Sequence, residues 1–136
     1  MKNLNDFLEV IYSDQRKQLL KEHGLPVRFT PINLMIMERN IRSIYKAIKC
    51  VRPEFLNLVG LFLGETIIEN INGATWDISN AKDIEDISVN IPSPSGKGFR
   101  VRPFITAMEF LDEEFENVLL NEFMLCLILA SVKESD

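Results

Sequence analysis

One stretch of this 136-residue chain decides its fold: residues 53–76 read PEFLNLVGLFLGETIIENINGATW. Apolar residues recur at helical intervals after Pro53, which suits a first helical turn because that position needs no amide donor. They surround most of the helix, so we expect neighbours on more than one side. Gly60 and Gly64 permit close approach of another backbone. The sequence therefore predicts a central helix over residues 53–71.

The pattern changes after Asn72 and Gly73, a pair typical of a helix C-terminus. Three short runs are then predicted as strands. Residues 74–78 are a short β-like run around Trp76, and residues 87–91 and 99–103 alternate apolar with polar residues. The Pro-, Ser- and Gly-rich residues 92–98 suit the tip of a hairpin. These segments predict a three-stranded antiparallel meander.

Three further segments have the helical period. They are residues 4–22, residues 31–51 and residues 104–132, with a kink or division near Asp112 as the alternative to one continuous last helix. The second contains one continuous apolar stripe: Leu34, Met37, Ile41, Ile44, Ile48 and Val51. The sequence predicts a single α+β domain over residues 1–136, with three N-terminal helices, the meander, and a C-terminal helix packed on one face of the sheet.

Composition and motifs exclude most common chemistries. Hydrophobic residues make up 46% and charged residues 26% of the chain, as in globular proteins. No signal-peptide pattern follows Met1, and no apolar run is long enough for a bilayer, which predicts a soluble cytoplasmic protein without membrane contact. His23 is the only histidine, and Cys50 and Cys126 are isolated thiols. Without a metal-ligand pair or a phosphate loop, we expect no metal, no cofactor and no enzymatic activity.

Charge is distributed unevenly along the chain. Residues 1–52 hold ten Lys/Arg against five Asp/Glu, and residues 53–136 hold five against fifteen, so that +5 and −10 give the net charge of −5. A basic ridge with 3-4-3 spacing follows the second helix, as either a solvated or a binding face: Arg39, Arg42, Lys46 and Lys49. The net negative charge argues against nucleic-acid binding.

In residues 53–136 the acidic side chains greatly outnumber the basic ones, which favours a basic protein partner. Charge complementarity between two proteins increases the rate and specificity of their association. The predicted contact residues are the carboxylates that are densest in this half: Asp83, Glu85, Asp86, Asp112, Glu113, Glu114 and Glu116. The alternative is that these exposed acids only keep a helix surface solvated. Glu65 stands apart because an acid between Leu63 and Ile67 is costly if buried without a partner. It is interpreted either as a structural hydrogen-bond acceptor near Trp76 or as a functional acid.

Two segments carry a resemblance: GLFLGE at residues 60–65 and ENINGATW at residues 69–76, followed later by Arg102, Pro103 and Phe104. They resemble a pattern in small bacterial domains of uncharacterised function, in which such a helix leads through a Gly turn into a Trp-bearing strand. The resemblance implies an α+β domain with the helix packed on the sheet, and it carries no catalytic residue. Domains of this kind occur among toxin-immunity proteins, so the resemblance implies an antidote that blocks a basic toxin domain through a complementary surface.

Two other functions stay open from the sequence. The first is a homodimer or other homo-oligomeric structural component, with an apolar helix surface as the interface. The second is a small hydrolase that uses a pair of carboxylates including Glu65, whose separation a sequence does not reveal.

Overall fold

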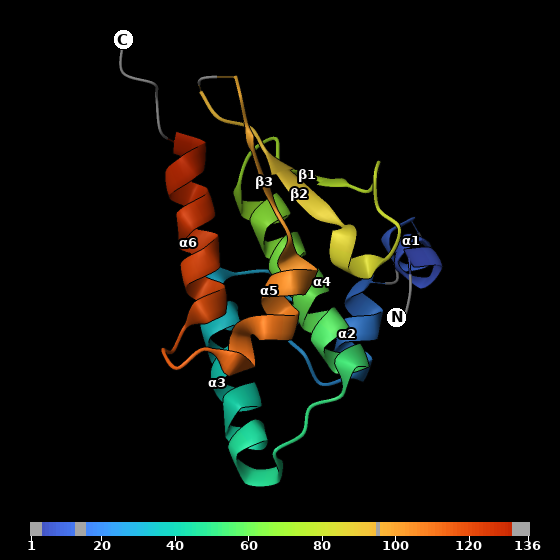
Figure 1. Cartoon of the computed structure of the whole chain (residues 1–136), viewed down its shortest axis with the longest axis vertical. Coiled ribbons are helices and arrows are strands. Elements are labelled where there is room, and N and C mark those ends of the chain that lie inside the picture. Colours follow the sequence, from blue (N-terminus) through green and yellow to red (C-terminus); the bar gives the residue numbers. More distant parts are fainter. Residues whose placement is uncertain (1–3, 13–15, 95, 132–136) are drawn as a thin grey trace.

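The computed structural model describes residues 4–12, 16–94 and 96–131, and these form an α+β domain (Figure 1). The described elements are six α-helices, two short 3-10 helices (η) and three strands: α1 (Leu4–Tyr12), α2 (Arg16–Glu22), α3 (Pro31–Ile48), α4 (Pro53–Asn70), β1 (Thr75–Asp77), η1 (Ile84–Asp86), β2 (Ser88–Ile91), β3 (Phe99–Val101), α5 (Pro103–Glu109), η2 (Phe110–Asp112) and α6 (Val118–Ser131). None of these helices combines the length and hydropathy needed to cross a bilayer.

The predicted α+β class and the antiparallel meander are confirmed, and the number of N-terminal helices is corrected. Four helices precede the sheet instead of three, because α1 and α2 are separate elements; residues 13–15 between them lie outside the described part of the chain. The predicted C-terminal helix is divided near Asp112, as the alternative had it. There the backbone leaves helical geometry, with Glu113 extended and Asn117 left-handed (φ 63°).

The sheet has the order β1-β2-β3, with Trp76 opposite Val89 and Asn90 opposite Arg100. A polar ladder crosses it, in which the Arg100 guanidinium lies 2.6 Å from the Asp77 carboxylate and also donates to Asn90. The helix packed against β1 and β2 is α4. The last helix, α6, packs chiefly on α3 and α4 instead of on the sheet, which corrects the predicted arrangement.

The central position predicted for α4 is confirmed, since it contacts α3, α5, α6 and the sheet. Its two glycines explain how neighbours come so close. A Cβ at Gly60 would lie 2.5 Å from Cδ1 of Phe104, and one at Gly64 would overlap the indole of Trp76. These two rings stack at 5.8 Å, and Phe7 of α1 meets both edge-on at 5.1 and 5.3 Å. Helix α4 thus packs against an aromatic cluster whose three rings come from α1, β1 and α5.

The apolar stripe of α3 is covered along only part of its length. Leu34, Met37 and Ile41 are buried, whereas Ile44 and Ile48 are 50% and 64% exposed. Figure 1 shows the C-terminal end of α3 projecting beyond the helices beside it.

Candidate functional site

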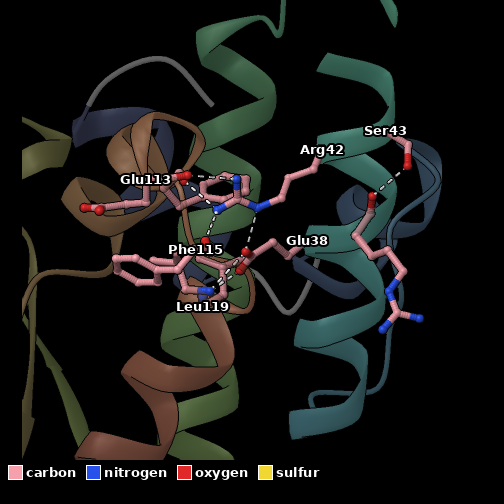
Figure 2. A network of polar contacts seen from close by, with 9 residues as sticks. Glu38, Arg42, Ser43, Glu113, Phe115 and Leu119 are labelled. Atoms are coloured by element: carbon pink, nitrogen blue, oxygen red, sulfur yellow. Dashed lines mark hydrogen bonds and ion pairs between the residues drawn. The ribbon is translucent and has the colours of Figure 1, made fainter. Parts of the chain in front are cut away.

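A buried ion pair lies on α3, where that helix faces the start of α6 (Figure 2). Glu38 is fully buried, and Arg42, one turn further along, donates from Nε to Glu38 Oε2 at 2.8 Å. Buried charges are tolerated in proteins when they are paired and their remaining hydrogen-bonding capacity is used. Both side chains meet that condition through contacts with a distant part of the chain.

The Glu38 carboxylate caps α6 from outside that helix. Its Oε1 accepts the backbone N–H of Leu119 at 2.7 Å, and its Oε2 accepts that of Val118 at 3.0 Å (Figure 2). The first amides of a helix have no partner within the helix, and negative charge is favourable at that end. Glu38 therefore defines where α6 begins.

The Arg42 guanidinium fixes the backbone that precedes α6. Its Nη2 donates to the carbonyl oxygens of Phe110 at 2.8 Å and Phe115 at 3.1 Å, and its Nη1 donates to that of Glu113 at 3.2 Å. The guanidinium also lies over the Phe110 ring, 5.6 Å from its centroid. We call Glu38 and Arg42 the α3 clamp, because together they hold the chain from Phe110 to Leu119.

The clamp presents one of the two predicted acidic groups to solvent. All the side chains of residues 112–116, which we call the acidic segment, are exposed, and Phe115, between Glu114 and Glu116 in the sequence, is 59% exposed. Because the clamp uses backbone carbonyls, the carboxylates of Asp112, Glu113, Glu114 and Glu116 stay on the outside. The result is an acidic surface that includes one exposed aromatic side chain and whose backbone is held by Arg42.

The other predicted acidic group lies at η1, and two of its carboxylates already accept hydrogen bonds from nearby backbone amides. Asp83 accepts the N–H of Glu85 at 3.1 Å, and Asp86 accepts those of Lys82 and Asp83 at 3.1 and 3.3 Å, which is a capping box. Glu85 is exposed. In Figure 1, η1 (yellow) and the segment before α6 lie on opposite sides of α5, so the fold does not merge the two groups into one cluster.

Glu65 joins three elements within the aromatic core of α4. It is 6% exposed, accepts the indole N–H of Trp76 at 3.2 Å and lies 3.1 Å from Arg16 Nε of α2. Burial raises the pKa of the Glu65 carboxyl, against the opposing effects of the Trp76 hydrogen bond and the Arg16 charge. The hydrogen bond near Trp76 that the sequence suggested is present, and this arrangement favours the structural interpretation of Glu65.

Two hollows flank the acidic segment. The one on the α3 side, about 90 Å³, is lined by residues including Arg39, Lys46 and Glu116, and is much smaller than the roughly 300–1,000 Å³ of typical small-molecule sites. The other, about 300 Å³, runs between α5 and α6 beside Phe115 and includes Glu122, whose pKa burial raises. In the described part of the chain, no three His, Cys, Asp or Glu residues are placed to hold a metal ion.

Sequence reasoning missed Glu38 and misplaced Arg42. Glu38 is the only acid between residues 31 and 52, four residues before Arg42, and this spacing was the available signal for an ion pair. The predicted basic ridge is therefore reduced, since Arg42 turns inward while Arg39, Lys46 and Lys49 are exposed.

Comparison with known proteins gave no family model, curated protein or solved structure that matches this chain.

Proposed function

We propose that this protein is a non-enzymatic protein-binding module, specifically an immunity protein that neutralises a cognate bacterial toxin by covering a basic surface of it. The observation that carries the proposal is the acidic segment, in which an exposed Phe115 stands among four exposed carboxylates on a backbone held by the α3 clamp.

Each part of this arrangement suits protein recognition. A fixed backbone lowers the conformational entropy lost on binding, which improves affinity without adding contacts. An aromatic side chain at the centre of a contact supplies much of the binding energy, and surrounding charges increase the rate and specificity of association. Asp83, Glu85 and Asp86 form a second acidic surface that adds long-range attraction for the same basic partner.

Co-purification with the product of the neighbouring gene tests the proposal. The variant Glu113→Lys/Glu114→Lys should slow association roughly tenfold or more, because it reverses charge at the contact. Glu22→Lys, which changes an exposed carboxylate on α2 outside both acidic groups, is the control and should have a much smaller effect. Equal binding by all three proteins, or a neighbouring product that is neither toxic nor bound, would count against the proposal.

A homo-oligomeric component is the second candidate, favoured by the exposed apolar side chains of α6. Met124, Leu125 and Ile128 are 45%, 49% and 56% exposed on a helix whose other side packs on α3 and α4. Such apolar surface marks interaction sites when it is contiguous. Sedimentation of a Met124→Ser/Ile128→Ser variant beside the unaltered protein would show whether this face associates.

The carboxylate hydrolase is the weakest candidate. Its acid, Glu65, already contacts Trp76 and Arg16 and is nearly inaccessible to solvent. A hydrolytic activity abolished by Glu65→Gln in a protein that remains folded would revive this candidate.

A further inference from the structure

An apolar groove lies where α3 passes into α4, and it shares no described lining residue with the two hollows beside the acidic segment. It has a volume of about 250 Å³, and its described lining residues are Ile41, Ile44, Cys50, Val51, Arg52 and Phe55. Ile44, which lines the groove, and Ile48, one turn further along α3, are half or more exposed. Exposed apolar surface of this kind marks an interaction site.

The charges around the groove restrict what it can bind. Arg52 lines it, and Lys49 immediately precedes the lining residue Cys50; both cationic side chains are exposed. No carboxylate is among the described residues that line the groove. The complementary ligand is therefore an apolar side chain flanked by carboxylates.

This chain itself carries a segment of that chemistry. Phe115 is 59% exposed and has Glu113, Glu114 and Glu116 as sequence neighbours, all exposed. The contacts of Arg42 with the Phe110, Glu113 and Phe115 carbonyls hold the segment in one conformation, so little entropy is lost when it docks.

We infer that the occupant of the groove is a second copy of this chain, whose Phe115 enters between α3 and α4 while its neighbouring carboxylates approach Lys49 and Arg52. The two contacting surfaces come from different parts of the chain, so the contact forms either twice in a closed two-fold dimer or head to tail in a ring or open chain of protomers. Self-association of this kind does not require the toxin-binding function. The two contacts would nevertheless use the same acidic segment, so a basic partner would compete with self-association.

Analytical ultracentrifugation of the full chain over about 5–500 μM tests the inference. The unaltered protein should shift to higher mass as concentration rises. Phe115→Ala should weaken that association about tenfold or more, because an anchoring apolar side chain is lost and each factor of ten needs only about 1.4 kcal/mol. Phe115 is largely exposed, so this variant should remain folded.

Exchanging the charges of the groove and of the acidic segment tests whether these two surfaces contact each other. Lys49→Glu/Arg52→Glu and Glu113→Lys/Glu114→Lys should each remain monomeric alone, and their equimolar mixture should associate again, since an acidic groove then meets a basic segment. Glu85→Lys serves as the control and should associate like the unaltered protein.

Cys50 gives an independent readout inside the groove. It is exposed, whereas Cys126 is fully buried and burial raises its pKa to about 12, so a thiol reagent should modify Cys50 selectively. Alkylation of Cys50 should slow as protein concentration rises, and Phe115→Ala should abolish this slowing. The inference is overturned by a protein that stays monomeric at every concentration. It is equally overturned by association that neither Phe115→Ala nor the charge exchange alters, which would assign the contact to another face such as that of α6.

Discussion

Glu38 and Arg42 illustrate, at the residue scale, how two side chains one turn apart organise a segment about seventy to eighty positions away. Removing one member of a buried pair leaves the other charged and unpaired, which typically costs about 3–5 kcal/mol. Glu38→Ala should therefore lower the free energy of unfolding by about that amount in urea denaturation. Arg39→Ala, on the exposed side of the same helix, should change it by less than about 0.5 kcal/mol. A small effect of Glu38→Ala would mean that the clamp does not stabilise the fold.

Glu65 gives a second prediction at this scale, concerning pH. Burial raises its pKa in the folded protein above the ordinary value of a glutamate. An acid with a raised folded pKa contributes stability below its unfolded pKa, and that contribution is lost as pH rises through the folded pKa. The free energy of unfolding of the unaltered protein, relative to Glu65→Gln, should thus fall as pH rises above the ordinary pKa of a glutamate, about 4.3. Parallel stability curves for the two proteins would contradict this.

At the scale of elements, the packing of α4 depends on the absence of a side chain at Gly64. Alanine favours helices by about 1 kcal/mol over glycine, but here its Cβ would overlap the Trp76 ring. Overpacking of a tight core costs about 1–3 kcal/mol, so Gly64→Ala should be destabilising overall in chemical denaturation. In a Trp76→Leu background the same substitution should cost less, because the overlapping ring is gone, and a double-mutant cycle measures the difference. Additive effects would show that the two residues are not coupled.

A second prediction for the elements concerns the start of α6. The amides of Val118 and Leu119 are held only by Glu38 among the described contacts of those two groups. Glu38→Gln keeps one acceptor oxygen but loses the charge, so hydrogen exchange at these two amides should speed up while exchange in the middle of α4 stays unchanged. Unaltered exchange at both amides would mean that α6 begins without the cap.

At the scale of the whole molecule, the proposed function makes the −10 charge of residues 53–136 the main attraction for a basic partner. Exposed charges are screened over roughly 10 Å at 0.1 M salt, so the rate of association should fall steeply between about 0.05 and 0.5 M salt, with a smaller change in dissociation. Stopped-flow measurement with the toxin candidate checks this. A rate that is independent of salt would remove the acidic surface from the proposed function.

The sequence by itself determined the elements whose pattern is local. The helical period located α3 and α4, and alternation located β2 and β3, because neighbours three, four or two positions apart share a face. Gly60 and Gly64 also predicted that a neighbour packs closely on α4. The sequence did not show that these neighbours are Phe104 and Trp76.

Only the tertiary structure decided which faces are covered and which charges are paired. Ile41 and Ile44 belong to one stripe, yet the first is buried and the second half exposed, because the C-terminal end of α3 projects beyond the helices beside it. Arg42 shares the basic ridge with Lys46, yet it turns towards carbonyls some seventy residues away. Periodicity shows which residues share a face but not what packs on it, and that depends on contacts between segments far apart in the chain.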